Sequence, residues 1–458
     1  MADKQTPDKS VIERLSQYMV AARSAKLPPE VSQKARHHIL DTIAAMVSGA
    51  SLEPGRLAIS YAQSLGGTPE AQVVGSSMVT TAVNAALVNG MLAHADETDD
   101  SHAPSGTHPG CAVVPAALAM AERANGSGET LLNAVVLGYD VGCRTMRALR
   151  PNQPLEGRTF SSHSIGGVFG AAAAASAFIE MTPTQVRHLL SYTAQQASGI
   201  PSWVTDQEHI EKAFDFGGMP ARSGVAAATM VEAGFTGVWD VFEGDRNFFQ
   251  AFEPSANREE LLNELGSRHE IMLTNIKKYC VGSPIQAAAD ALLNIMREHQ
   301  VRATDVEQMT VTLSEGGART VNDRHMPDIN LQYMLATTLL DGDLTFVAAH
   351  DYPRMTDPQV LELRKRIDLR GDNALVTPES PRQAVVELTT RDGHRFRDHV
   401  VTVRGTAENP MTTEEVETKA RELLLPSLGE TRTEALIAMV RNLGSLSTVR
   451  ELRPLLTG

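Results

Sequence analysis

Apolar residues recur every three or four positions from about residue 10 to residue 265, which is the period of α-helices with one buried face. Alanine-rich runs such as GAAAAASAF at residues 170–178 carry few bulky side chains and favour helices that pack closely. One helix has a clear start, because Thr182, Pro183 and Gln185 suit the N-cap, the first helical position and a capping box. We therefore predict a mostly helical protein.

The pattern changes after about residue 267. MTVTLSEGG at residues 309–317 alternates between apolar and polar residues, as a half-buried strand does. Residues 384–405 predict two strands around Asp392-Gly393, a typical hairpin turn. Residues 329–342, INLQYMLATTLLDG, predict a buried helix that ends at Gly342. This part of the chain is expected to form a smaller α+β unit.

The chain returns to helical periodicity near Thr412, where Thr412 and Glu415 can form a second capping box. We predict a large helical domain built from residues 1–266 and 408–458, and a smaller α+β domain of residues 267–407. The fold class is therefore mostly α, with the helical domain formed by both ends of the chain.

The charge excludes one class of partner. The net charge is -14, the pI is near 5.5, and no run of lysine and arginine is longer than three residues. This pattern does not provide the positive surface that holds a nucleic-acid backbone. A few cations in a cleft can still bind a small anion, so an anionic substrate is compatible with the sequence.

Other features indicate a cytoplasmic protein. The start, MADKQTPDKSVIERLSQYMV, has no apolar core of the kind found in signal peptides, and no segment is long and apolar enough to span a bilayer. Cys111, Cys143 and Cys280 lie far apart and form no CxxC motif, which favours reduced thiols. We expect a soluble protein with no membrane partner.

The stretch HADETDDSHAPSGTHPG at residues 94–110 contains three histidines and four carboxylates. Its spacing argues against a metal, because His94, His102 and His108 do not form HxxxH and the acids do not match a calcium loop. His108 directly precedes the apolar run CAVVPAALAMAE, and a helix beginning there would favour an anion at its N-terminus. The competing interpretation is a solvated acidic loop.

His163 lies in a similar position, between a polar loop and Gly166-Gly167 before the alanine-rich helix. Imidazole is the side chain whose charge changes closest to neutral pH, which suits acid/base chemistry. A histidine at a helix start is also common as a core or capping residue, and both interpretations stay open.

The segment EKAFDFGGMPARSG at residues 211–224 places Lys212, Asp215 and Arg222 around two glycines. Glycines let the backbone approach a ligand closely, and the two cations suit a carboxylate or a phosphate. The segment is not a phosphate-binding P-loop, because GKS or GKT is missing and no strand precedes it.

Two further candidates have plain structural alternatives. Lys277 and Lys278 precede an apolar helix in IKKYCVGSPIQAAADAL, where an exposed lysine pair is equally expected. Tyr333 lies in the apolar stretch INLQYMLA, where a core tyrosine is the simpler interpretation.

The chain has neither a GxSxG elbow nor a GxGxxG turn after a strand, so neither a serine nucleophile nor a nicotinamide or flavin cofactor is indicated.

The order of these clusters resembles the MmgE/PrpD family. It runs through HxxxxDDS, HPG and VPAALAMAE, a histidine before GGVFGAAAAA, then KxxDxGGMPAR, KKYCVGSPIQA and a tyrosine before LLDG. The family includes 2-methylcitrate dehydratase, cis-aconitate decarboxylase and iminodisuccinate epimerase. The resemblance implies a large helical domain, a smaller α+β lid domain, a homodimer, and acid/base catalysis without a metal or an organic cofactor.

The resemblance also implies roles for individual residues. The expected catalytic residues are His108, His163, Lys212 and Tyr333. The expected substrate-binding residues are Glu97, Ser101, His102, Lys278 and Arg222. His102 lies in the loop between Ser101 and His108, which is one residue longer than the family pattern, and there it either adapts the site to its substrate or is solvated. The chain departs from the family pattern at Asp215 and Ser283, where many members have histidine.

We therefore expect a cofactor-independent lyase, either a dehydratase or a decarboxylase, that acts next to a carboxylate on a small di- or tricarboxylic acid. Cations would spread the charge that develops on the substrate, and a group near neutrality would move the proton. One alternative is an epimerase or racemase of an iminodisuccinate-like dicarboxylate. Two others are a helical interaction protein that has lost catalysis and a metal-dependent hydrolase.

Overall fold

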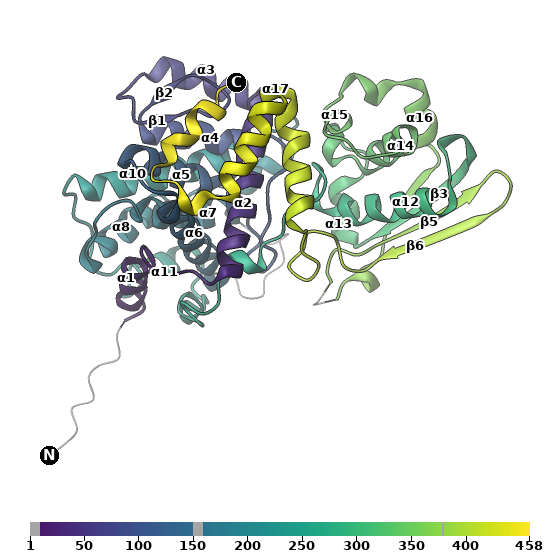
Figure 1. Ribbon diagram of the computed structural model, residues 1–458. Helices are drawn as coiled ribbons and strands as arrows, with labels where there is room; N and C mark the ends of the chain where they lie inside the picture. Colours follow the sequence, from purple (N-terminus) through teal and green to yellow (C-terminus); the bar gives the residue numbers. More distant parts are fainter. Residues whose placement is uncertain (1–9, 150–158, 378–379) are drawn as a thin grey trace. The chain divides into compact units, whose positions relative to one another are not determined.

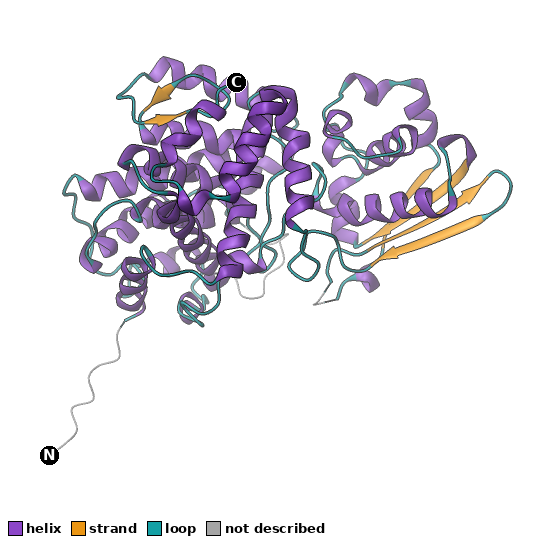
Figure 2. Cartoon of the chain, in the orientation of Figure 1, coloured by secondary structure: helices purple, strands orange, loops and turns teal. Residues whose placement is uncertain are grey.

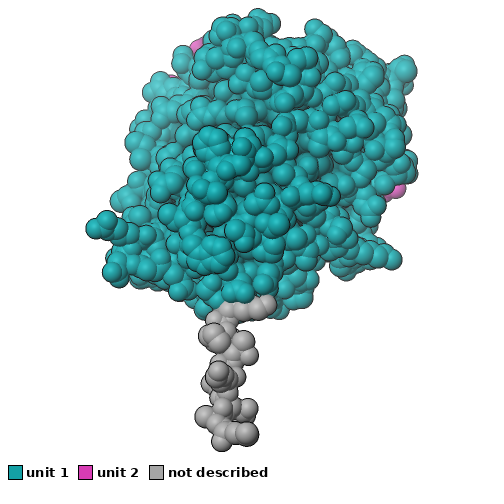
Figure 3. Space-filling view, turned by 90° about the vertical axis from the view of Figure 1, so that its left-hand side faces the viewer, with its two compact units in different colours: residues 1–95, 100–274, 424–458 teal, residues 96–99, 275–423 magenta. Residues whose placement is uncertain are grey.

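The computed structural model describes residues 10–149, 159–377 and 380–458. The first nine residues, part of the segment judged above not to be a signal peptide, lie outside the described residues. The chain forms two compact units. Unit 1 comprises residues 1–95, 100–274 and 424–458, and unit 2 comprises residues 96–99 and 275–423 (Figure 3). The chain thus changes unit after residues 95, 99, 274 and 423, whereas the predicted domain limits follow residues 266 and 407.

Unit 1 is almost entirely helical, as predicted (Figure 1). Its α-helices are α1 (Val11–Ala22), α2 (Pro29–Gly49), α3 (Glu53–Leu65), α4 (Ala82–Ala93), α5 (Gly110–Ala124), α6 (Gly128–Leu149), α7 (Ser162–Ser176), α8 (Pro183–Gln196), α9 (Ile210–Ala213), α10 (Met219–Glu232) and α11 (Phe248–Phe252). The described residues of this unit before residue 274 also form a short antiparallel pair, β1 (Ala71–Gln72) and β2 (Val79–Thr80), short 3-10 turns and the π-helix η3 (Phe214–Gly218).

Helix α7 is central to unit 1 and packs against α5, α6 and α10. All fifteen of its residues are buried, which its small alanine and glycine side chains make possible. Glycines let α6 and α7 approach closely, because a Cβ atom at Gly142 would lie 2.5 Å from the carbonyl oxygen of Gly166. The capping box predicted at Thr182 and Gln185 is present at the start of α8 and is confirmed.

Unit 2 contains a four-stranded sheet in the order β4-β3-β5-β6, the larger group of orange arrows in Figure 2. The strands are β3 (Val306–Leu313), β4 (Ile367–Gly371), β5 (Ala384–Thr390) and β6 (Arg395–Val400). Strand β3 pairs parallel with β4 and antiparallel with β5. The predicted hairpin joins β5 to β6, and Gly393 has the positive φ of 91° that its turn requires.

The helices of unit 2 are α12 (Gln286–His299), α13 (Glu315–Val321), α14 (Leu331–Asp341), α15 (Phe346–Ala349) and α16 (Pro358–Arg364). Helix α12 packs on β5 and β6. Helix α14 ends at Gly342 as predicted, with φ of 80°. The strand predicted over residues 309–317 ends earlier, because Ser314 accepts a hydrogen bond from the Gly317 N–H and begins α13.

Helix α17 (Thr413–Arg441) follows the capping box predicted at Thr412 and Glu415, in which both reciprocal hydrogen bonds form. The helix is not continuous, because Gly429 has a non-helical φ of 72° shortly after Pro426. No helix within residues 10–149, 159–377 and 380–458 combines the length and the apolar character of a bilayer span.

Candidate active site

Phe216 of the π-helix η3 is the centre of a cluster of aromatic and imidazole rings in unit 1. The ring of His163, from the first turn of α7, stacks on it with centroids 3.6 Å apart and planes inclined by 11°. The ring of His94, which follows α4, also stacks on it, with centroids 4.3 Å apart. Phe216 thereby holds two imidazoles from distant parts of the sequence in fixed orientations.

Two further histidines extend this cluster. The ring of His108 meets those of His94 and His163 edge to face, with centroid distances of 5.3 and 5.1 Å. The ring of His209 lies 5.1 Å from that of His94. We call His94, His108, His163, His209 and Phe216 the histidine cluster. It gathers several groups that can give or take a proton near neutral pH.

A lysine lies directly beside the histidine cluster. The Lys212 ammonium is 5.3 Å from the ring centroid of Phe216 and 5.7 Å from that of Trp203. Trp203 itself meets His163 and Phe216 edge to face. Aromatic faces attract a cation through their quadrupole, so these two rings favour an ammonium at this position. The arrangement combines a positive charge with proton-handling groups.

Glycines place η3 close to α4. A Cβ atom at Gly217 would lie 2.0 Å from the carbonyl oxygen of Gly90, and one at Gly218 would lie 2.5 Å from the Met91 side chain. Helix α4 occupies the space beside these glycines. The expectation that they let the backbone approach a ligand is therefore wrong. Single-turn π-helices are frequent at functional sites, and this one presents Phe216.

Asp215 precedes Phe216 and is buried. Its Oδ2 atom accepts a hydrogen bond from the Ser161 hydroxyl at 2.5 Å. Burial raises the pKa of Asp215 to about 7, against the lowering effect of hydrogen bonds from Ser161 and Ser164, and Glu211 raises it further. A carboxyl that changes charge near neutrality therefore lies next to the histidine cluster.

Asp100 anchors the start of α5, just after His108. Its Oδ1 atom accepts the Gly110 N–H at 2.9 Å, and its Oδ2 atom lies 2.7 Å from Nδ1 of His38 and accepts the Tyr139 hydroxyl. A carboxylate is favoured at a helix N-terminus by the partial positive charge there. Asp100 thus stabilises the backbone that carries His108.

His102 lies in a different environment within unit 1. Its Nε2 atom is 3.2 Å from the buried carboxylate of Glu270, and its Nδ1 atom is 2.7 Å from the Ser105 hydroxyl. Glu270 also faces Arg144, Arg147 and Arg268. Although burial acts in the opposite direction, His102, Arg147 and Arg144 lower the pKa of Glu270 to about 2. The substrate-binding role of His102 stays a prediction.

Residues 96–99, three of which are acidic, belong to unit 2, where Glu97 contacts Lys277. The Lys277 ammonium lies 2.8 Å from the Glu97 carbonyl oxygen, 3.4 Å from its carboxylate and 3.4 Å from that of Asp99. Burial lowers the pKa of Lys277, but Asp99 and Glu97 raise it more. Asp96 accepts hydrogen bonds from Thr98 and pairs with His350 at 3.0 Å.

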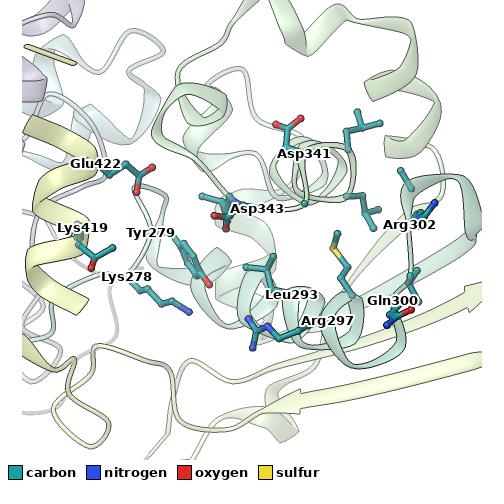
Figure 4. Close-up of a pocket in the computed structure, with 18 of the residues that line it drawn as sticks. Lys278, Tyr279, Leu293, Arg297, Gln300, Arg302, Asp341, Asp343, Lys419 and Glu422 are labelled. Carbon is teal, nitrogen blue, oxygen red and sulfur yellow. Dashed lines mark hydrogen bonds between the residues drawn. The ribbon is translucent and has the colours of Figure 1, made fainter. Parts of the chain in front are cut away.

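Lys278, unlike the adjacent Lys277, pairs with Asp290. Its ammonium lies 2.8 Å from the Asp290 carboxylate, and its side chain is 35% exposed. It lines a pocket of about 1230 Å³ in unit 2, which Figure 4 shows with Tyr279 beside it. Several charged groups of this pocket already have protein partners, since Asp341 pairs with Arg354 and the Lys419 ammonium donates to the Thr98 carbonyl oxygen. We therefore do not take this pocket as the candidate active site.

The remaining predicted residues each have their own surroundings within their unit. Tyr333 is fully buried in unit 2, where its hydroxyl lies within hydrogen-bond distance of the carbonyl oxygens of Ala348 and Asp351, and burial raises its pKa to about 12. Ser101 is buried in unit 1. The Arg222 guanidinium, on α10, lies 5.9 Å from the Phe214 ring. Ser283 begins the 3-10 turn before α12.

The structure thus brings together His108, His163 and Lys212 among the predicted residues. The sequence interpretation omitted five residues from its site that the structure shows in charged or aromatic contacts: His94, Trp203, His209, Phe216 and Lys277. His94 was visible as the first residue of the acidic stretch, and His209 as a histidine just before Lys212. The choice between Lys277 and Lys278 had no signal in the sequence, since the two lysines are adjacent.

Two family models match most of the chain. The model of the MmgE/PrpD N-terminal domain matches residues 13–260, and that of the MmgE/PrpD C-terminal domain matches residues 279–445. The chain is 27% identical to cis-aconitate decarboxylase of Homo sapiens over 472 residues, which cover 98% of this chain and 95% of that protein.

Two other relatives are similar over comparable lengths. Cis-aconitate decarboxylase of Mus musculus is 26% identical, over 98% of this chain and 94% of that protein. The cis-aconitate decarboxylase-like protein oryM of Aspergillus oryzae is 24% identical, over 99% of this chain and 98% of that protein. The resemblance predicted from the order of the motifs is confirmed.

Proposed function

Since the chain belongs to the MmgE/PrpD family and is an enzyme of its dehydratase and decarboxylase type, we propose that it is a lyase that removes carbon dioxide from cis-aconitate or a similar unsaturated tricarboxylate. We propose that it does so by acid/base chemistry of its own side chains, without a metal or an organic cofactor. The observation that carries the proposal is the position of the Lys212 ammonium beside the imidazoles of the histidine cluster.

The chemistry requires a place for negative charge and a source of a proton. When the carbon–carbon bond to the departing carboxylate breaks, its electron pair stays on the substrate carbon and carbon dioxide leaves. A cation near the remaining carboxylates lowers the energy of this carbanion by spreading its charge. A proton from a positioned acid then forms the new C–H bond.

Unit 1 contains groups suited to both tasks. The Lys212 ammonium would pair with a substrate carboxylate. His108 or His163, as imidazolium, would donate the proton to carbon and regain one from solvent. The net reaction consumes one proton and releases one carbon dioxide for each substrate molecule.

The surroundings favour this chemistry. His163 is only 7% exposed, and electrostatic interactions are stronger where water is excluded. The stack with Phe216 restricts its ring to one orientation. Fixed orientation of reacting groups removes an entropic cost from the barrier.

The direct test is turnover of cis-aconitate by the purified protein. Carbon dioxide and a product lighter by that mass are expected in equal amounts, and in deuterated water the product should carry one deuterium on carbon. Gain or loss of water without carbon dioxide would instead identify a hydratase or dehydratase. Deuterium entering recovered dicarboxylate without any other change of mass would identify an epimerase, and no reaction with any tested acid would overturn the proposal.

The proposal includes a homodimer and a cytoplasmic location, which the family resemblance and the cysteine pattern led us to expect. Light scattering of the purified protein tests the first and cell fractionation the second. Elemental analysis tests the expected absence of a metal, and one equivalent of zinc or iron would contradict it.

A further inference from the structure

Asp215 is enclosed by protein on both sides of its carboxyl group. The residue is 6% exposed and lies in η3, directly before Phe216. Its Oδ2 atom accepts the Ser161 hydroxyl. Its Oδ1 atom faces Gly199, where a Cβ atom would lie only 2.6 Å from it. Gly199 has φ of 106°, so both its conformation and this contact require glycine.

Ser161 links Asp215 to the helix that carries His163. It is the N-cap of α7, and its hydroxyl oxygen accepts the Ser164 N–H at 3.5 Å. Its own N–H donates to the carbonyl oxygen of Gly199 at 3.0 Å. His163 lies inside this capped turn, between Ser161 and Ser164. The position of its imidazole therefore depends on how Ser161 is held.

We propose that Asp215 is a positioning residue whose ionised carboxylate, acting through Ser161, holds the first turn of α7 and thereby His163 in place for catalysis. The inference rests on the function proposed above and adds a residue to that site. Asp215 acts through Ser161, so it is distinct from the groups that would contact the substrate.

Only the ionised form of Asp215 is expected to hold Ser161 in this way, because the Ser161 hydroxyl must donate the hydrogen bond. A carboxylate accepts the Ser161 proton and leaves an oxygen lone pair of Ser161 for the Ser164 N–H. A protonated Asp215 would instead donate to the Ser161 oxygen and compete with that N–H. Protonation is therefore expected to loosen the cap of α7, and the raised pKa of Asp215, about 7, places this change near neutral pH.

Other titratable groups surround the same turn. The elements packed against η3 are α4, α5, α7, α9 and α10. They and their ends carry the following ionisable residues: His94, His108, Cys111, Glu122, Arg123, His163, His209, Glu211, Lys212, Arg222 and Glu232. Imidazole is a side-chain type whose charge changes between about pH 5 and 8. A pH profile of the wild type alone therefore cannot identify Asp215.

The first test is the pH dependence of kcat and KM for wild type and Asp215→Asn. In the wild type, ionisation of Asp215 should contribute a rise in kcat with pH through about 7, which loss of the imidazolium proton donor opposes. Asparagine cannot ionise, so this rise should be absent in the variant. Its kcat should be lower by about a hundredfold, as for a misplaced catalytic group, with KM little changed because Lys212 is intact.

The second test uses two variants that leave the carboxyl in place. Ser161→Ala removes the link between Asp215 and α7, so the rise should disappear as in Asp215→Asn, whereas Glu211→Gln should move its midpoint to lower pH because Glu211 raises the pKa of Asp215. Glu211 is exposed and lies outside the histidine cluster. The exposed acid variant Glu208→Gln is the matched control and should leave the midpoint unchanged.

A third measurement needs no substrate. Infrared spectroscopy should detect a protonated carboxyl that titrates near pH 7 in the wild type and is missing in Asp215→Asn. Absence of this band, or a pH profile of Asp215→Asn identical to the wild type, would overturn the inference. Failure of the wild type to turn over any carboxylate would overturn the proposed function instead, and the infrared titration would still report on Asp215.

Discussion

The imidazole of His163 stacks on the phenyl ring of Phe216, with centroids 3.6 Å apart and planes inclined by 11°. The contact joins α7 to η3, two elements that are separated in the sequence by α8, the 3-10 helix Pro201–Thr205 and α9. It gives a histidine at a helix start a single orientation beside Lys212 and His108. The stack therefore ties the packing of unit 1 to the chemistry proposed for it.

Replacement of Phe216 by leucine tests this link. Leucine keeps an apolar side chain of similar size and removes the flat face on which two imidazoles stack. An aromatic pair is worth about 0.5–1.5 kcal/mol, so loss of the His163 stack alone should lower kcat by up to roughly tenfold. Steady-state kinetics measure this effect. Phe248→Leu, in a separate aromatic cluster of unit 1, should leave kcat unchanged; equal losses in both variants would indicate a general packing effect.

Lys212→Met removes the cation beside the histidine cluster and keeps most of the apolar side chain. We expect kcat/KM for cis-aconitate to fall by about 10²–10³, the usual effect of losing one group that stabilises developing charge. Lys212→Arg should retain part of the activity because it retains the charge. Lys365→Met, whose wild-type side chain is 75% exposed, is the control. Full activity of Lys212→Met would remove this lysine from the site.

Replacement of Lys277 should destabilise the protein more than replacement of the adjacent Lys278. Lys277→Met would leave the buried carboxylates of Glu97 and Asp99 without this cation, which should cost about 3–5 kcal/mol. Lys278→Met breaks a partly exposed pair with Asp290 and should cost at most about 1 kcal/mol. Denaturant unfolding of the two variants measures the difference. A larger loss of unfolding free energy in Lys278→Met than in Lys277→Met would contradict the view that Lys277 is the lysine that stabilises buried carboxylates.

Glu270 should contribute to stability in acid. Its pKa is lowered from 4.5 to about 2 in the folded protein, so its contribution is complete above about pH 4.5 and is lost as the pH falls toward 2. The shift corresponds to roughly 3 kcal/mol. Unfolding measured between these pH values should show this loss in the wild type and not in Glu270→Gln. Glu298→Gln, at an exposed site on α12, should retain the wild-type acid dependence.

Much of the fold could be predicted because its signals are local. The capping boxes at Thr182 and Thr412 and the turn at Asp392-Gly393 depend on residues within a few positions of each other. The break of α17 at Gly429 was missed, since the amphipathic pattern continues through it. The end of β3 was also missed, because the Ser314 cap competes with the alternating pattern.

The candidate site could be predicted only in part. His108, His163 and Lys212 each stood next to a recognisable helix start or glycine pair, and the structure gathers them around one ring. Phe216 had no such signal, because an aromatic residue in an apolar stretch is usually a core residue. Tyr333 and Lys278 have partners within unit 2 and Arg222 lies near Phe214, contacts that sequence spacing could not reveal.

The sequence by itself determined the helical periodicity, the sheet hairpin, the capping residues and the family, because each of these depends on neighbouring residues or on the order of motifs along the chain. Only the tertiary structure decided which polar side chains share an environment. Phe216 meets His94 and His163 because the small residues of α4, α7 and η3 let their backbones approach, and such contacts depend on packing between segments far apart in the sequence.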